Sequence, residues 1–172
     1  ANIGTSQARP NQLEGHKRLE NPGYDSAGMA VLDSQTGELN VCKAVGRVFQ
    51  LEEKLDQVGG FEGVLGMAHT RWATHGAVTE PNCHPHTDES GDIAVIHNGI
   101  IENYATLRTY LQEKGRTFKS ETDTEVLAQL ISELHDPAEG MDLEKAVQAA
   151  MREVTGAYAI CVASKDEPDT LV

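Results

Sequence analysis

An α+β fold is predicted for this sequence, because short strand-like runs alternate along the chain with amphipathic helical segments. Residues 26–33 and 38–46 have the composition of two strands joined by a glycine-containing turn. Residues 48–59 carry apolar side chains at helical spacing, and residues 92–100 contain an apolar run that ends in polar residues. The sequence contains no internal repeat, low-complexity tract or linker, so we expect one domain over residues 1–172.

The helices of the N-terminal half are predicted from composition and spacing. Residues 11–20 have a helix-forming composition but few strongly apolar side chains. The helix over residues 48–59 places Val48, Leu51 and Leu55 on one face and ends at a glycine, which is typical of a helix C-terminus.

Two predicted strands and a long loop follow. Residues 63–73 and 92–100 are strand-like, and each run ends in a group of polar side chains. Residues 74–91 form the loop between them, and loops of this length are usually functional or disordered. Polar groups at strand ends are well placed to converge on a pocket.

The C-terminal half is predicted to be mainly helical. Thr122 and Glu125 have the spacing of a capping box, which marks the start of a helix. The expected elements are helices at residues 103–115, 122–136 and 142–156, a strand at 157–166, and the start of another strand at 169–172.

Charge and composition exclude several classes of protein. The 172 residues include 27 Asp and Glu but 14 Lys and Arg, which gives a formal net charge of −13. A negatively charged protein is repelled by nucleic acid and by anionic membranes, so we expect neither as a partner. The sequence has no apolar run long enough for a transmembrane helix and no signal-peptide pattern at its start, which indicates a cytoplasmic protein.

Cys42, Cys83 and Cys161 are the three cysteines of the sequence. Their odd number and their spacing match neither a disulfide framework nor a zinc ribbon, and a reducing compartment fits them. Cys42 and Cys161 lie in apolar strand-like runs, so we expect them to be buried.

Histidines and an aspartate in and after the long loop each have an ordinary structural explanation. His84, His86, His97 and Asp123 are suitable zinc ligands by type, but their spacing matches no metal motif, and loop polarity is the more common reason for such histidines. We expect no metal and no cofactor. The Asn-Gly pair at 98–99 is typical of a hairpin turn, and Asp123 of an acidic residue in the first turn of a helix.

Five motifs, however, occur together and in order. They are YDSAG, AHTRWATHG, HPH, VIHNGIIENY and FKSETDTEV. In order and approximate spacing they resemble the glutaminase domain of the glutamine–fructose-6-phosphate aminotransferases, and GYDSAG favours this group over other class II glutamine amidotransferases. The resemblance runs from about Leu13 to the last residue. It implies the αββα sandwich of the N-terminal-nucleophile hydrolases, with two antiparallel sheets stacked between helical layers.

The resemblance implies a pocket for L-glutamine. Arg71 would bind the α-carboxylate, since a guanidinium offers a planar, bidentate donor fork, and Thr74 and His75 would add donors beside it. Asp123 would pair with the α-ammonium group. Trp72 would line the pocket or shield a channel, although a single Trp is as often a core residue.

The resemblance also implies which groups act on the reacting amide. Asn98 would offer its side-chain amide and Gly99 its backbone N–H to the oxyanion, and a glycine lets the backbone approach closely. His84, His86 and His97 are candidate supporting residues.

The nucleophile that the resemblance implies is a cysteine at the mature N-terminus, whose own α-amine is the general base. The sequence begins at Ala1, and that cysteine would lie a few residues upstream, so the chain as written is expected to be inactive. Asn21 and Pro22 stand where the family has an aromatic residue and an arginine. We expect a partial type-2 amidotransferase domain over residues 1–172, incomplete at both ends and without the sugar-phosphate isomerase domain.

Two functions stay open at this point. In the first, the parent protein is a homodimeric enzyme that hydrolyses L-glutamine to glutamate and ammonia and transfers the ammonia to fructose 6-phosphate in the isomerase domain. In the second, the chain is a non-catalytic glutamine-binding remnant or an interaction domain, because the pocket residues are present and the nucleophile is not.

Overall fold

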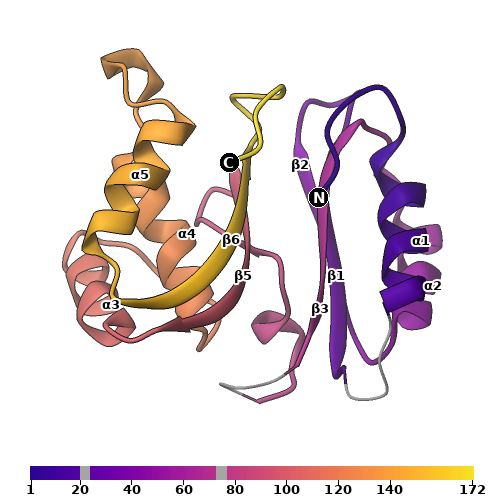
Figure 1. The fold of residues 1–172 in the computed structure, drawn as a ribbon, viewed down its shortest axis with the longest axis horizontal. Coiled ribbons are helices and arrows are strands. Elements are labelled where there is room, and N and C mark those ends of the chain that lie inside the picture. The colour runs from indigo at the N-terminus through magenta and orange to yellow at the C-terminus, as the bar shows by residue number, and fades with distance from the viewer. Residues whose placement is uncertain (20–23, 73–76) are drawn as a thin grey trace. The chain divides into compact units, whose positions relative to one another are not determined.

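The computed structural model describes residues 1–19, 24–72 and 77–172. These residues form two compact units that divide between Pro85 and His86. Each unit has its own three-stranded sheet with helices packed against it (Figure 1). The predicted α+β class is therefore confirmed.

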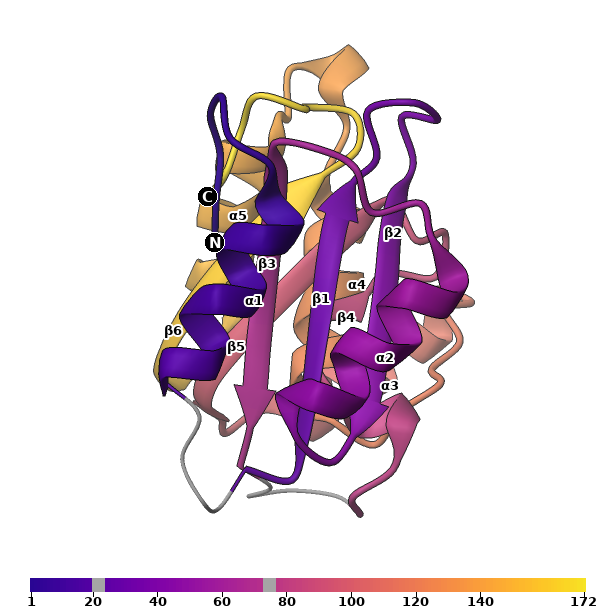
Figure 2. The ribbon, with the colours of Figure 1, turned by 90° about the vertical axis from the view of Figure 1, so that its right-hand side faces the viewer.

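The sheet of the N-terminal unit has the strand order β2-β1-β3. Its central strand pairs in antiparallel fashion with both neighbours, with Ser26 opposite Val45 on one side and opposite Arg71 on the other. Two helices lie over one face of this sheet (Figure 2). The elements are α1 (Ala8–Leu19), β1 (Ser26–Leu32), β2 (Leu39–Val45), α2 (Val48–Val58) and β3 (Leu65–Arg71).

Helix α2 shows how local pattern and packing agree in this unit. Val48, Leu51 and Leu55 are buried, as their spacing predicts. The helix is followed by Gly59 with φ 66°, a backbone conformation that favours glycine, and the Gly59 N–H donates to the Leu55 carbonyl. The predicted helix and its glycine end are confirmed.

The sheet of the C-terminal unit has the strand order β4-β5-β6, and both pairings are antiparallel. Its core combines buried residues of β5 and β6 with those of the helices, such as Val95, Val126 and Ile131. The elements are β4 (His86–Thr87), β5 (Ile93–Ile101), α3 (Tyr104–Glu113), α4 (Asp123–Leu134), a 3-10 turn (Pro137–Glu139), α5 (Leu143–Glu153) and β6 (Gly156–Ser164). The strand start predicted at residues 169–172 is a single bridge, Leu171 opposite Ala163.

The loop predicted over residues 74–91 contains more regular structure than expected. Residues Glu80–Asn82 form a 3-10 turn, and the short strand β4 pairs with β5, with His86 opposite Val95. A strand of two residues is too short to show alternation of polar and apolar side chains, so its sequence does not predict it. Pairing with β5 creates it.

Helix α4 begins at its predicted cap, but the capping box is only half formed. The Thr122 hydroxyl accepts a hydrogen bond from the Glu125 N–H at 3.3 Å. The Glu125 carboxylate does not return this bond as predicted and instead accepts from the N–H groups of Lys119 at 2.8 Å and Ser120 at 2.6 Å. The Thr122 N–H, which would donate to the Glu125 carboxylate in a complete capping box, donates to the Ser120 hydroxyl at 3.3 Å instead.

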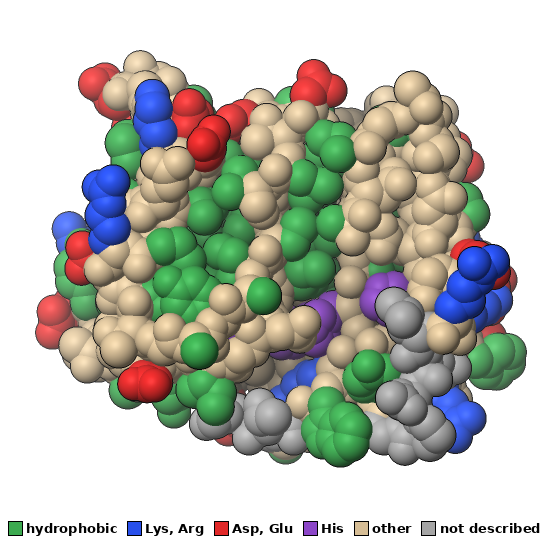
Figure 3. Space-filling model, in the orientation of Figure 1, with side chains coloured by type: hydrophobic (Ala, Val, Ile, Leu, Met, Phe, Trp, Pro, Cys, Tyr) green, Lys and Arg blue, Asp and Glu red, His purple; other side chains and the backbone are tan. Residues whose placement is uncertain are grey.

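Helix α5 is amphipathic. Helix α5 buries Leu143 and Val147, while Glu144, Lys145 and Arg152 are exposed, and Figure 3 shows acidic and basic side chains together on this part of the surface. Among the residues that the structure describes, no helix is long and apolar enough to cross a membrane.

Candidate functional site

Asp123 is the first residue of α4, and its carboxylate is tied to the end of strand β5. The Oδ2 atom accepts a hydrogen bond from the Ile101 N–H at 2.9 Å. The side chain of Asp123 is 13% exposed, so the carboxylate is largely withdrawn from water. An acid at this position also interacts favourably with the positive end of the helix dipole. The structure thus presents a fixed, partly accessible negative charge at the start of α4.

Asn98 and Gly99 lie inside strand β5, opposite Ala159 and Tyr158 of β6. The hairpin-turn interpretation of this Asn-Gly pair is therefore wrong, whereas the strand predicted over residues 92–100 is confirmed, since β5 spans Ile93–Ile101. Pairing with β6, which lies far along the chain, keeps these residues extended. Their role at an oxyanion stays a prediction.

Gly99 is a position where only glycine fits. Its φ is 130°, and a Cβ atom built there would lie 2.2 Å from the Ala157 carbonyl oxygen. Side chains rarely adopt such a backbone angle, and the strand partner leaves no space for one. Two predicted site residues thus lie near the same end of β5. Gly99 is part of the strand, and Asp123 is hydrogen-bonded to Ile101, the last residue of the strand.

His97 also lies on β5 and is buried against α4. Its Nδ1 atom is 2.9 Å from the Thr124 hydroxyl and 3.9 Å from Asp123 Oδ1. Burial lowers the pKa of His97, and the nearby Asp123 carboxylate raises it by a smaller amount. His97 is thus a predominantly neutral imidazole at neutral pH, next to the carboxylate that the sequence assigns to the ligand.

His86 is almost completely buried on β4 and contacts the cap of the same helix. Its Nε2 atom is 3.1 Å from the hydroxyl of Thr122, the N-cap residue of α4. The structure therefore brings His86 and His97 to the first turn of α4, each through a threonine hydroxyl. Their role as supporting residues of the site stays a prediction.

Arg71 is the last residue of β3, in the N-terminal unit, and is only 5% exposed. One guanidinium nitrogen, Nη1, lies 3.9 Å from Asp25 Oδ1 and donates to the Ala77 carbonyl at 3.4 Å. Asp25 is also held through its backbone N–H, which donates to the Arg71 carbonyl at 3.0 Å. Arg71 is thus a buried cation that already has a carboxylate nearby.

The other predicted residues of this unit differ in their surroundings. The ring of His84 stacks on that of His69, with the centroids 4.3 Å apart. Gly28 permits this packing, because a Cβ atom there would lie 1.8 Å from the His84 carbonyl oxygen. Thr74 and His75 lie outside the described residues.

Trp72 is 65% exposed, so its interpretation as a core residue is wrong. It comes directly after β3 ends at Arg71, where the chain leaves the sheet. A ring that stays accessible at this point agrees with the other interpretation, that Trp72 lines or covers a pocket, and that interpretation stays a prediction.

The cysteines are poor nucleophiles in their present surroundings. Burial raises the pKa of the Cys42 and Cys161 thiols, which disfavours the reactive thiolate. Cys83 is fully buried, and its Sγ donates to the Thr79 carbonyl at 3.2 Å. The expected burial of Cys42 is confirmed, whereas Cys161 is only half-buried.

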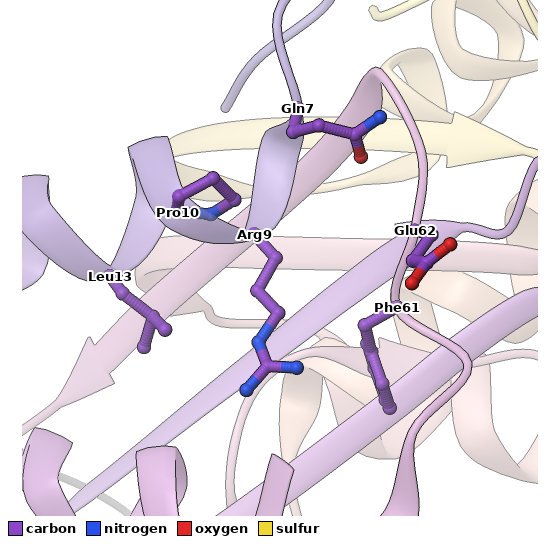
Figure 4. A pocket seen from close by; sticks show the side chains of 6 residues that line it. All are labelled: Gln7, Arg9, Pro10, Leu13, Phe61 and Glu62. Carbon is purple, nitrogen blue, oxygen red and sulfur yellow. The ribbon is translucent and has the colours of Figure 1, made fainter. Parts of the chain in front are cut away.

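The N-terminal unit also has an open pocket of about 340 Å³ (Figure 4). Leu13 and Phe61 give it an apolar lining, and Arg9 borders it while pairing with Asp56. None of the predicted site residues that are described lines this pocket, and it contributes nothing to the candidate site. In the described part of the chain, no group of three or more His, Cys, Asp or Glu residues is arranged to hold a metal ion.

Sequence reasoning missed three contributors to the site. Thr124, Asp25 and the Ile101 N–H all contact predicted residues, but the sequence alone singles out none of them. Their position in the sequence could have indicated Thr124 and Asp25, because Thr124 follows Asp123 in the motif FKSETDTEV and Asp25 lies in the motif YDSAG. Neither position says which partner the side chain meets.

A family model described as a glutamine amidotransferase domain matches residues 69–172, and the chain belongs to this family. Among curated proteins, the chain is 51% identical over 172 residues to the glutamine–fructose-6-phosphate aminotransferase (isomerizing) of Chlorobaculum tepidum. It is 52% identical over 170 residues to the aminotransferase of the same name from Gloeobacter violaceus. The resemblance stated from the motifs is confirmed. Both matches cover 99% of the chain but only 28% and 27% of the relatives, so the chain spans less than a third of their length.

Solved structures support the same fold class. Glutamine phosphoribosylpyrophosphate amidotransferase from B. subtilis is similar over 95% of the chain, with a TM-score of 0.74 and 26% identity, and 34% of that protein is covered. A structure described as the allosteric regulatory enzyme of purine biosynthesis has a TM-score of 0.77 and 25% identity over the same share of the chain. The predicted fold, that of the N-terminal-nucleophile amidotransferases, is confirmed.

Proposed function

We propose that residues 1–172 form the glutaminase part of a glutamine–fructose-6-phosphate aminotransferase. This part binds L-glutamine and hydrolyses it to glutamate and ammonia, and the ammonia is transferred to fructose 6-phosphate in a further domain. The observation that carries the proposal is the identity of about half of the residues over 99% of the chain to aminotransferases of that name. The parent protein is proposed to be a cytoplasmic homodimer.

In this proposal Arg71 and Asp123 bind the two charged ends of the amino-acid group of glutamine. Arg71 is buried at the end of β3, and its guanidinium has five N–H donors in a planar fork that can bind a second carboxylate in addition to Asp25. The Asp123 Oδ2 atom is taken by the Ile101 N–H, and the Oδ1 atom faces groups that do not neutralise it. Each side chain therefore offers a full charge of the sign that a zwitterion requires.

The reacting amide is proposed to meet Asn98 and Gly99. Attack on the amide carbon places negative charge on its oxygen, and neutral N–H donors fixed in advance stabilise that charge without reorganisation. The pairing with β6 holds this segment in a strand, and the close approach of the Ala157 carbonyl at Gly99 leaves no space for a side chain there. A donor pair held in this way suits an oxyanion better than a flexible turn would.

The nucleophile of the proposed hydrolysis is not one of the described thiols. Cys42 and Cys161 have raised pKa values, and Cys83 is enclosed and hydrogen-bonded to a backbone carbonyl. We assign this step to the terminal cysteine of the family, with its α-amine as the base. The attack forms a thioester and releases ammonia, and water then releases glutamate.

A binding domain without chemistry is the second candidate, because the binding groups and the nucleophile are separate parts of the protein. The two candidates differ in turnover but not in affinity. A non-catalytic domain binds L-glutamine and leaves it intact, whereas the enzyme consumes it.

The test uses the complete gene product that includes residues 1–172. Ammonia and glutamate are measured with L-glutamine alone and with added fructose 6-phosphate, and glutamine binding is measured by calorimetry. We expect glutamine hydrolysis, and amino-sugar phosphate when fructose 6-phosphate is present. Binding without turnover would favour the non-catalytic domain, and the absence of both binding and turnover would refute glutamine as the ligand.

A further inference from the structure

The Asp123 carboxylate is held by neutral groups on both of its oxygens. The Ile101 N–H donates to Oδ2 at 2.9 Å, and the Thr124 hydroxyl donates to Oδ1 at 3.4 Å. Both donors are neutral, so they orient the carboxylate without cancelling its charge. The Thr124 bond is long, which means that its strength depends on how the hydroxyl is aimed.

The imidazole of His97 aims that hydroxyl. A threonine hydroxyl has one proton, and when it is given to Asp123 the oxygen accepts from His97 Nδ1, 2.9 Å away. In the opposite arrangement the hydroxyl would give its proton to Nδ1, and Asp123 Oδ1 would lose its donor and face the lone pairs of the hydroxyl oxygen, which is unfavourable. Proton donation therefore runs from His97 to Thr124 and from Thr124 to Asp123.

The side chains of Thr124 and His97 are shielded from water, and both are uncharged at neutral pH. Thr124 is fully buried, and the side chain of His97 is 2% exposed. Burial keeps the pKa of His97 below its ordinary value, so the ring does not become a cation that would compete for Asp123. Its other nitrogen, Nε2, has no hydrogen-bond partner among the residues that the structure describes. Leaving a buried imidazole nitrogen without a partner is unfavourable, so this buried histidine is a position to test for a role in the site.

We propose that His97 and Thr124 are positioning residues, which hold the Asp123 carboxylate in the orientation that selects ligands with an α-ammonium group. This inference rests on the proposed function, in which Asp123 meets that group. The two residues touch Asp123 and not the ligand, so their effect is on selectivity between ligands with and without the cation rather than on binding in general. Such preorganisation lowers the cost of binding a cation, because the carboxylate does not have to be ordered at that moment.

The test compares two ligands that differ only in the cation. L-glutamine carries the α-ammonium group, and glutaramate is the same molecule without it. Dissociation constants for both are measured in the complete gene product, and their ratio is the selectivity for the cation. The ratio is insensitive to a general loss of folded protein, since both ligands are affected equally.

Three variants and one matched control are compared with the unaltered protein. Thr124→Val removes the hydroxyl at nearly constant shape, and Thr124→Ser keeps it. His97→Gln removes the donor at the Nδ1 position. Ser132→Ala is the control, because this hydroxyl lies on the same helix and donates to Asp88 at 2.9 Å, away from Asp123.

We expect Thr124→Val to reduce the selectivity for L-glutamine about tenfold, the usual effect of one hydrogen bond to a charged group. His97→Gln is expected to reduce it less, and Thr124→Ser and Ser132→Ala to leave it unchanged. Thermal unfolding of each variant gives the stability independently of the ratio.

Asp123→Asn distinguishes the ligand-binding role of Asp123 from the positioning role of His97 and Thr124. If this change leaves the ratio unaltered, Asp123 does not meet the ammonium group and the proposed function of Asp123 fails. If Asp123→Asn removes the selectivity but Thr124→Val and His97→Gln keep it, the positioning role is refuted while the proposed function stands. Equal losses in Thr124→Val and Ser132→Ala would also refute it, because they would indicate a general effect of hydroxyl removal from α4.

Discussion

Arg71 in the N-terminal unit and Asp123 in the C-terminal unit are the two charged residues assigned to glutamine, and the protein holds them differently. Arg71 ends a strand and already has a carboxylate, Asp25, at 3.9 Å. Asp123 starts a helix and is contacted by a backbone N–H and a neutral hydroxyl. Under the proposed function, an incoming carboxylate would share the guanidinium with Asp25, whereas an incoming ammonium group would meet a carboxylate whose hydrogen-bond donors are neutral.

The difference shows two ways in which a buried charged side chain can be held in place and still attract a charged ligand. A guanidinium has five donors and can serve a structural and a ligand carboxylate together, so a resident partner does not block it. A carboxylate whose charge is cancelled by a resident cation would lose its attraction for a ligand cation. The neutral imidazole of His97 avoids this loss, because burial lowers its pKa.

The largest effect is expected at Asn98, which lies three residues before Ile101, the residue of β5 whose N–H donates to Asp123. Asn98→Asp replaces a neutral donor by a carboxylate that faces the developing negative charge. We expect kcat for glutamine hydrolysis to fall about 10²- to 10³-fold, with a smaller change in KM, as for the loss of an oxyanion donor. Steady-state kinetics of the complete gene product measure it. A nearly silent substitution would remove Asn98 from the oxyanion site.

The next largest effect is expected on glutamine binding when Arg71 or Asp123 is replaced. Arg71→Lys keeps the positive charge but loses the bidentate fork, and we expect glutamine binding to weaken by roughly 1.5–3 kcal/mol. Asp123→Asn keeps the shape but loses the negative charge, and it should weaken binding of L-glutamine but not of glutaramate. Calorimetry measures both. Unchanged glutamine affinity in both variants would refute the idea that these residues bind the two ends of the ligand.

The smallest effect concerns pH and compares one histidine from each unit. Burial lowers the pKa of both His16 and His97 below 6.5, so the unfolded chain binds protons that the folded chain resists. The stability that these two neutral, buried imidazoles contribute is fully present above pH 6.5. It is lost as the pH falls from 6.5 through the lowered pKa values of the folded protein. We expect His16→Gln and His97→Gln each to flatten the decline of the free energy of unfolding below pH 6.5.

Asp123→Asn distinguishes the two histidines, because Asp123 raises the pKa of His97 and is not among the groups that act on His16. The substitution should lower the pKa of His97 further and leave His16 unchanged, as followed by NMR titration of the imidazole protons. Equal shifts at both histidines would show that the coupling of His97 to Asp123 is not specific.

Local patterns predicted the elements whose cause is local. The burial of Val48, Leu51 and Leu55 follows from their spacing on one helix face, and Thr122 caps α4 because its hydroxyl reaches an N–H three residues away. The motifs also identified the family correctly, since five short segments in a fixed order are a property of the sequence alone.

Contacts between distant residues were decided by the tertiary structure. Asn98 and Gly99 have the local chemistry of a turn, but hydrogen-bonded pairing with residues about 60 positions away keeps them in a strand. Trp72 is exposed because the chain leaves the sheet directly before it. The apolar run before Asn98 indicates a strand over residues 92–100, but the choice between a strand and a turn at the Asn-Gly pair is made by the pairing with β6.

The same holds for the environment of each charge. The amino-acid sequence determined which residues carry charge and that they lie in the motifs of a glutamine amidotransferase domain. Only the tertiary structure placed His97 against Thr124, 27 residues further along, and Asp25 beside Arg71. The physical reason is that hydrogen bonding and burial depend on which elements pack together, and these two effects decide whether a buried group is charged, neutral or oriented for a ligand.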